Sequence, residues 1–250
     1  IENGHRWPDD PAALKAWLGQ YGLPFISGWY STELLTRCVD GEIAAVQVLD
    51  AACGSGNFLY VALRQLLDLW HEVSLFAAQV GLTQFNLAFA PNPSQLHGIE
   101  INETAHQLAQ TAIQIGYIQW LRRRGFGTPS EPILKPLDTI VNMDAILAYD
   151  AQGKPYEPEW PKVDAIIGNP PFLGGNKIRA ELGHVKTDIL FTLYKNRVPG
   201  AADMVCYWFD KASRALIQGK TKRVGLLATQ AIRGGANRSV LDHIKKIGDI

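Results

Sequence analysis

The chain has 250 residues, with 24 basic and 24 acidic side chains and 47% hydrophobic residues. This composition excludes a disordered chain, and three cysteines without a CxxC pair indicate neither a zinc site nor a disulfide framework. The zero net charge does not fit a free-standing protein that coats nucleic acid, because such binding depends on Lys and Arg neutralising phosphates.

Residues 1–27 are rich in Pro, Trp and charge, and we expect them to form an N-terminal extension with a short helix near residues 12–18. No apolar run of about 18 residues is present, so no transmembrane helix is predicted. No signal peptide is visible, and the cysteines are typical of reduced thiols. We therefore expect a cytoplasmic protein.

Strands and helices alternate along the rest of the sequence. Strands are predicted over residues 46–50, 96–100, 140–142, 163–168 and 223–229, and helices over 58–73, 103–124, 202–218 and 238–246. Residues 74–94 are expected to form a surface excursion and 150–161 a loop, whereas 174–198 favour no single element. This alternation predicts an α/β fold with a mostly parallel sheet between helices.

Unusual residues follow four of the predicted strands. They are residues 50–56, Glu100, Asp144, and the sequence Asn169-Pro170-Pro171-Phe172. Because ligands bind at the carboxyl ends of strands in open parallel sheets, this coincidence is the main functional signal.

The first strand end joins a carboxylate to a glycine turn. The turn at Gly54 and Gly56 lets a ligand approach the backbone closely, whereas Asp50 repels a phosphate and suits a cationic ammonium group. Glu100 can accept hydrogen bonds from a ribose diol, and Asp144 can accept one from an exocyclic amine. Each of these residues also fits a purely structural role when taken alone.

The Asn-Pro-Pro-Phe turn is more specific. Two prolines stiffen the turn and remove two donors, which leaves the Asn169 side-chain oxygen and the Pro170 carbonyl as a pair of acceptors. Such a pair can hold an sp2 amine and stabilise the positive charge that develops as a methyl group arrives. Phe172 offers a flat face for a planar ring. The structural alternative is a rigid turn with a buried phenylalanine.

These two motifs carry a family resemblance. Residues 50–58 (DAACGSGNF) and 169–172 (NPPF) resemble motifs I and IV of S-adenosylmethionine-dependent DNA adenine-N6 methyltransferases. Longer phrases at residues 169–175, 202–209 and 228–237 resemble the methyltransferase domain of MmeI-like single-chain type II restriction–modification enzymes. The resemblance implies a Rossmann-like class I methyltransferase fold over residues 28–250. It also implies that the last hairpin of the sheet, a target-recognition domain and a nuclease domain lie outside this chain.

The resemblance assigns roles residue by residue. The implied cofactor is S-adenosylmethionine, held by Thr32, Asp50, Ala51, Cys53, Gly54, Glu100, Ile101, Asp144 and Ala145. The implied catalytic residues are Asn169, Pro170, Pro171 and Phe172, with the last one stacking on the target base. The chain departs from the family pattern at Ala51 and Glu33, where proline is usual, so the match around Thr32 is weaker.

The implied reaction is methyl transfer to N6 of an adenine flipped out of double-stranded DNA, without a metal. Basic residues suited to phosphate contacts, or to a solvated surface, are Lys177, Arg179, Lys186, Arg233 and Arg238. Tyr207, Trp208 and Phe209 are expected in the core. Two alternatives remain open: methylation of RNA guanine or protein glutamine, and an inactive fragment that only binds cofactor.

Overall fold

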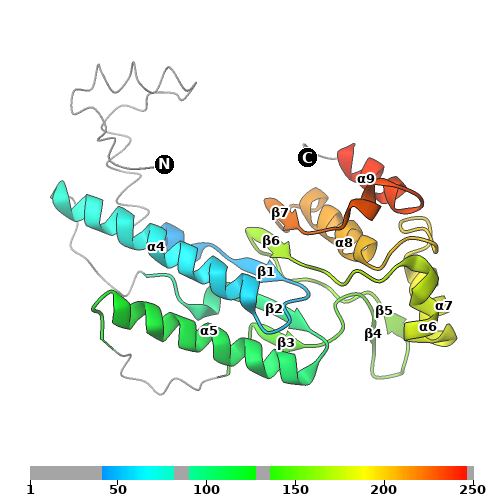
Figure 1. Ribbon diagram of the computed structural model, residues 1–250, viewed down its shortest axis with the longest axis horizontal. Helices are drawn as coiled ribbons and strands as arrows, with labels where there is room; N and C mark the ends of the chain where they lie inside the picture. The colour runs from blue at the N-terminus through cyan, green and yellow to red at the C-terminus, as the bar shows by residue number, and fades with distance from the viewer. Residues whose placement is uncertain (1–40, 82–89, 128–135, 247–250) are drawn as a thin grey trace, which may run out of the picture.

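The computed structural model describes residues 41–81, 90–127 and 136–246 (Figure 1). Thr32, the N-terminal extension and its predicted helix lie outside these residues. The strands of the main sheet are β1 (Val48–Asp50), β2 (Leu96–Glu100), β3 (Ile140–Asn142), β6 (Ala165–Gly168) and β7 (Arg223–Leu226). Their order is β3-β2-β1-β6-β7 and every neighbouring pair is parallel, which confirms the predicted α/β fold.

The strand order reverses between β1 and β6. In open α/β sheets such a switch point creates a crevice at the carboxyl ends of the strands. Asp50 ends β1 and pairs in register with Ile167, and Gly168 ends β6. The two motifs singled out in the sequence therefore leave the sheet side by side.

One face of the sheet is covered by two long helices, α4 (Asn57–Gln79) and α5 (Glu103–Arg123) (Figure 1). A buried apolar cluster joins these helices to Val48, Leu96 and Ile140. The prediction that residues 74–94 form a surface excursion is wrong at its start, because α4 continues to Gln79. The helix continues because Ser74 and Ala77 extend its buried stripe.

Asn102 caps α5, since its side-chain oxygen accepts a hydrogen bond of 2.9 Å from the Ala105 N–H. Arg124, which follows the last residue of α5, forms a 2.8 Å ion pair with Asp68 of α4. This ion pair therefore helps to join the two helices.

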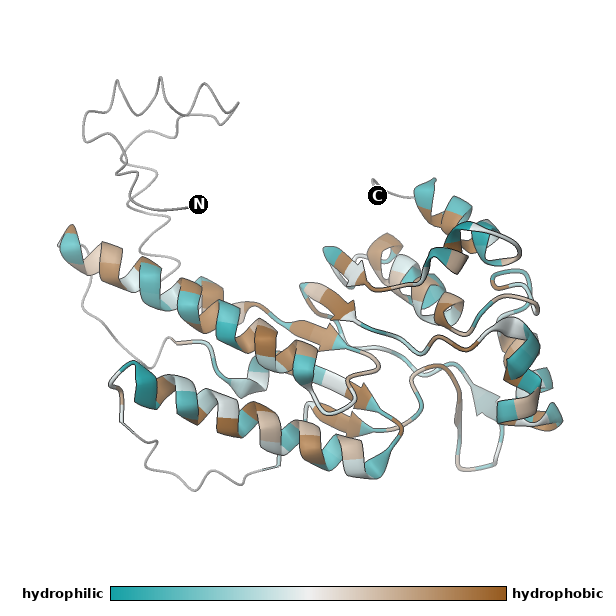
Figure 2. Cartoon of the chain, viewed as in Figure 1, coloured by the Kyte–Doolittle hydropathy of each residue, from teal (hydrophilic) through white to brown (hydrophobic). Residues whose placement is uncertain are grey.

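On the other face of the sheet, α8 (Val205–Ile217) packs against β7 and α9 (Asn237–Lys245) packs beside α8. The helices α6 (Gly175–Leu182) and α7 (His184–Leu193) lie beyond the carboxyl ends of the strands (Figure 1) and join the buried cluster of this face through Ile178 and Leu190. Leu49, Ile99 and Ile166 contribute to the buried cluster on this face. The sheet thus lies between two helical layers, and Figure 2 shows hydrophobic strands at the centre with helices of mixed polarity around them.

Several short elements complete the fold: α3 (Ile43–Ala45), η3 (Pro93–Gln95), η4 (Gln230–Arg233) and the hairpin of β4 (Ala148–Tyr149) and β5 (Pro155–Tyr156). The prediction of a plain loop over 150–161 is wrong where this hairpin forms. β7 is also shorter than predicted, because the chain turns toward η4. None of the helices within the described ranges is long and apolar enough to cross a membrane.

Candidate functional site

A pocket of about 380 Å³ lies at the carboxyl ends of the central strands. Several residues predicted from the sequence line it: Ala51, Glu100, Ile101, Asp144, Ala145, Asn169 and Pro171. The other lining residues are Ala52, Ile99, Met143, Leu182, Lys186, Met204 and Trp208. The fold therefore brings the ends of four strands to one cavity.

Asp50 lies just behind the pocket wall and is only 1% exposed. Its Oδ1 accepts a hydrogen bond of 3.0 Å from the Ala52 N–H. Burial raises the pKa of Asp50 to about 7, against the lowering effect of that hydrogen bond, and the nearby charge of Glu100 adds to the rise. A cationic group next to Asp50 would stabilise the charged form of this buried carboxylate.

Gly168 makes the close approach of β6 to Asp50 possible. A Cβ atom added at Gly168 would lie 2.5 Å from Asp50 Oδ1, and the residue has a φ of +151° that other residues rarely adopt. The glycine at the end of β6 is thus required by the carboxylate at the end of β1.

Glu100 ties the glycine turn to the next strand end. Its Oε2 accepts the Gly54 N–H at 2.9 Å, and its Oε1 accepts the Asn102 N–H at 2.7 Å. Each carboxylate oxygen keeps a further lone pair, so both can still accept a hydrogen bond from a ligand diol.

Cys53 and Gly54 do not line the pocket: Cys53 is buried and Gly54 is half-buried. The Cys53 N–H donates to the Ile99 carbonyl at 3.1 Å, and its sulfur packs against Gly98. Burial raises the pKa of the Cys53 thiol to about 12, so this cysteine is not a nucleophile.

Asp144 is the most heavily bonded acid in the pocket. Its Oδ1 accepts the N–H groups of Ile146 at 2.9 Å and Leu147 at 3.2 Å, and its Oδ2 accepts Lys186 Nζ at 2.9 Å. Lys186 is therefore neither the solvated charge nor the rim phosphate contact that the sequence suggested. One acceptor position is left on Oδ2 for a ligand amine.

The Asn-Pro-Pro-Phe turn leaves β6 at the mouth of the pocket. Asn169 and Pro171 line the pocket, whereas Pro170 is buried beside it. Within the described residues the Asn169 side chain makes no hydrogen bond, so its oxygen is available. Phe172 lies outside the pocket and is 47% exposed, which contradicts the alternative of a buried phenylalanine.

The three longer phrases that carry the family resemblance meet at Asp203. Its Oδ1 accepts the Gly175 N–H at 3.0 Å, and its Oδ2 accepts Asn237 Nδ2 at 2.8 Å. The Asp203 N–H donates in turn to Asn237 Oδ1 at 2.7 Å. The phrases at 169–175, 202–209 and 228–237 thus form one scaffold behind the Asn-Pro-Pro-Phe turn.

Trp208 was expected only in the core. It is buried as predicted, but its indole N–H also donates to the Ala51 carbonyl at 2.9 Å and its ring lines the pocket. Lys186 and Leu182 come from the segment that sequence reasoning left unassigned. Neither residue belongs to a sequence motif that predicts a pocket, because the packing of α6 and α7 determines where their side chains lie.

The basic residues outside the pocket differ in their surroundings. Arg179 pairs with Asp188 at 2.8 Å, and Arg238 pairs with Asp242 at 3.4 Å. Lys177 and Arg233 are exposed and form no ion pair with the part of the chain that the structure describes. No group of three potential metal-ligating side chains occurs within 41–81, 90–127 and 136–246.

Known proteins resemble this chain in sequence and in fold. The model of the MmeI DNA-methyltransferase domain matches residues 30–246. DNA methyltransferase A of Bacillus subtilis (strain 168) is 27% identical over 213 residues, which are 84% of this chain and 23% of that protein. The chain therefore spans about a quarter of the length of this curated relative.

The fold is similar to that of the type IIL restriction–modification enzyme MmeI, solved in complex with DNA. The TM-score is 0.63 at 22% identity, over 88% of this chain and 31% of that one. The likeness in structure supports the fold, and the family match covers most of the sequence. The chain belongs to the MmeI DNA-methyltransferase domain family.

Proposed function

We propose that this chain transfers a methyl group from S-adenosylmethionine to N6 of an adenine in DNA. The observation that carries the proposal is the Asn169-Pro170-Pro171 turn at the mouth of a pocket whose walls hold Glu100 and Asp144. Family membership supports DNA methylation, and the Asn-Pro-Pro-Phe sequence supports an exocyclic amine as the acceptor.

The residues of the pocket fit the proposed cofactor. The buried carboxylate of Asp50 suits the ammonium end, the remaining lone pairs of Glu100 suit a ribose diol, and Asp144 retains one position for an adenine amine. Ile101 adds an apolar contact surface. A volume of about 380 Å³ is in the range of ordinary cofactor pockets. When bound, S-adenosylmethionine supplies an electrophilic methyl group.

The chain's own residues would orient the acceptor. The Asn169 oxygen and the Pro170 carbonyl would accept the two hydrogens of the amine and stabilise the positive charge that develops on its nitrogen. Phe172, which is half exposed, would stack on a base flipped out of the duplex. Because the amine loses its proton after the attack, positioning rather than a strong base would supply the rate enhancement.

The DNA substrate is supported by the relatives. One is named a DNA methyltransferase, and the MmeI structure contains DNA. Lys177 and Arg233 are exposed basic side chains suited to phosphate contacts. We further propose that the chain serves as the modification part of a restriction–modification enzyme, with target recognition and cleavage carried by other domains.

A methyl-transfer assay with labelled S-adenosylmethionine tests the proposal. We expect label on adenine N6 in DNA, no label on ribosomal RNA or protein, and loss of transfer in Asn169→Ala. Label on RNA guanine or protein glutamine would replace the proposed acceptor. Calorimetry with S-adenosylhomocysteine is the companion measurement, because absence of binding would favour an inactive chain.

A further inference from the structure

Two aromatic side chains hold the pocket wall from behind. Trp160 Nε1 donates to the Ala145 carbonyl at 3.0 Å, and the Tyr194 hydroxyl donates to the Ile146 carbonyl at 3.0 Å. Both aromatic side chains are buried, and the two carbonyls they hold are consecutive. Ala145 itself lines the pocket next to Asp144.

A cation lies over each of these rings. Lys211 Nζ is 5.0 Å from the centroid of the Trp160 ring, and the guanidinium carbon of Arg197 is 4.4 Å from the centroid of the Tyr194 ring. Such contacts fix the orientation of a buried ring. Burial also raises the pKa of the Tyr194 hydroxyl, which therefore remains a hydrogen-bond donor.

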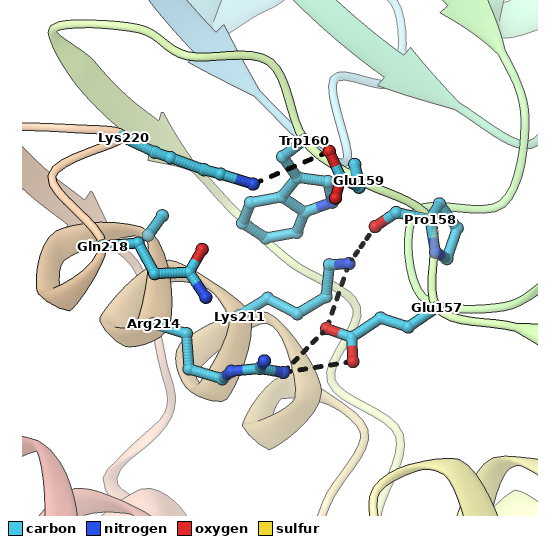
Figure 3. Close-up of a pocket in the computed structure, with 9 residues that line it drawn as sticks. Glu157, Pro158, Glu159, Trp160, Lys211, Arg214, Gln218 and Lys220 are labelled. Atoms are coloured by element: carbon cyan, nitrogen blue, oxygen red, sulfur yellow. Dashed lines mark hydrogen bonds and ion pairs between the residues drawn. The ribbon is translucent and has the colours of Figure 1, made fainter.

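Both cations meet at one carboxylate. Glu157 Oε2 accepts Arg197 Nη2 at 2.6 Å, and Glu157 Oε1 lies 3.4 Å from Lys211 Nζ. Burial alone would raise the pKa of Glu157, but the hydrogen bond from Arg197 and the neighbouring positive charges hold it below its usual range. Figure 3 shows Lys211 between Glu157, the Pro158 carbonyl and the Trp160 ring.

We infer that Trp160 and Tyr194 are positioning residues, which fix the Ala145–Ile146 backbone and thereby keep the pocket wall ordered before a ligand arrives. The inference rests on the proposed function, because it names what prepares the adenine end of the pocket. Residues 144–147 lie outside the strands of the main sheet. Their order therefore depends on side-chain partners, and a wall ordered in advance lowers the entropic cost of binding.

Conservative variants separate positioning from bulk stability. Tyr194→Phe removes only the donor hydroxyl, and Trp160→Phe removes the donor N–H together with part of the indole ring, a loss of volume that Trp120→Phe reproduces. The matched controls are Trp120→Phe, which loses a 2.8 Å bond to Asp68 between α4 and α5, and Tyr207→Phe, whose buried hydroxyl has no hydrogen-bond partner among the described residues.

In the intact protein we expect Trp160→Phe and Tyr194→Phe each to weaken S-adenosylhomocysteine binding about tenfold, the size of one lost buried hydrogen bond. KM for S-adenosylmethionine should rise with kcat nearly unchanged, and both controls should stay within about twofold of the unaltered protein. Unchanged affinity, or an equal loss in the controls, would overturn the inference.

A second measurement decides the inference without a ligand. Amide hydrogen exchange at residues 144–147 should be about tenfold faster in Trp160→Phe and Tyr194→Phe, and unchanged in Trp120→Phe and Tyr207→Phe. If the unaltered protein binds no cofactor, the proposed function fails. The exchange pattern still tests the inference in that case, because it reports the order of the pocket wall without a ligand. Exchange that is equal in all four variants would contradict it.

Discussion

The layer formed by α4 and α5 and the layer that contains α7 and α8 bury different kinds of side chain. Under α4 and α5 the buried residues are mostly apolar, as at Leu59, Leu63 and Ile113. Under α7 and α8 the fold also buries Thr187 and Asp210, among other polar side chains.

The difference follows the position of the pocket. Its side-chain supports come chiefly from the polar layer: Trp208 bonds to Ala51, and Lys186 bonds to Asp144. The glycine turn leads into α4 of the apolar layer, and this layer packs against one face of the sheet. We therefore expect changes in the first layer to affect stability, and changes in the second to affect ligand binding and catalysis.

Replacement of Asn169 by alanine should have the largest effect on activity. Loss of one preorganised acceptor at a developing charge lowers kcat by about 10²- to 10³-fold in comparable sites. The side chain is exposed, so the melting temperature should change little. Single-turnover methyl transfer measures the first quantity and calorimetric unfolding the second. Full activity in this variant would show that Asn169 has no catalytic role.

Leu63→Ala tests the apolar layer. Leu63 is only 1% exposed, and its truncation should cost about 2 to 5 kcal/mol of unfolding free energy. Urea unfolding monitored by circular dichroism measures this cost. Cofactor affinity of the folded protein should remain within about threefold at low temperature, because none of the residues that line the pocket belongs to α4. A large loss of affinity would contradict the expectation that changes in the apolar layer affect stability alone.

Asp50→Asn should separate stability from function at one residue. The folded-state pKa of Asp50 is raised to about 7 from an ordinary value near 4, so the folded state binds more protons between these values. The contribution of Asp50 to the free energy of unfolding therefore falls as pH rises from about 4 to 7 and stays low above 7. Asparagine does not ionise, so the variant avoids this loss of stability, and its side-chain oxygen can still accept the hydrogen bond from the Ala52 N–H.

We expect this variant to melt about 2 to 8 °C higher than the unaltered protein at pH 8, with little difference near pH 4. Its affinity for S-adenosylhomocysteine should fall at least about tenfold, because the charge that suits the ammonium group is gone. Scanning calorimetry at both pH values, together with binding titrations, measures both effects. A lower melting temperature at pH 8 would mean that the carboxylate stabilises the fold.

The smallest effect is expected for Arg124→Met. Its ion pair with Asp68 joins α4 to α5 at the surface, where 39% of the arginine side chain is exposed. Exposed pairs contribute about 0.2 to 1 kcal/mol, so the variant should lose no more than that in denaturant unfolding and nothing in cofactor binding. A loss above about 2 kcal/mol would show that the pair is part of a larger network.

The two layers also differ in how well the sequence predicts them. The helix α4 and the strand ends at Asp50 and Glu100 depend on local signals, and each is confirmed. The β4–β5 hairpin and the helices α6 and α7 were missed, since residues 174–198 lack a clear period.

The same limit applies to the site. Its Asn-Pro-Pro-Phe turn and its three acidic strand ends stand out as short motifs. Trp160, Tyr194 and Lys186 do not, because their roles depend on partners 15 to 48 residues away in the sequence. No local pattern encodes such pairings.

The bonds of Asp203 to Gly175 and Asn237 also bear on how the chain is made. During synthesis from the N-terminus, the elements β1, α4, β2 and α5 all emerge from the ribosome before the rest of the sheet, and N-terminal parts of a chain generally fold first. The scaffold behind the Asn-Pro-Pro-Phe turn needs Asn237, which emerges from the ribosome more than a hundred residues later. The growing chain would thus carry the glycine turn and its Glu100 partner well before the residues behind the Asn-Pro-Pro-Phe turn exist.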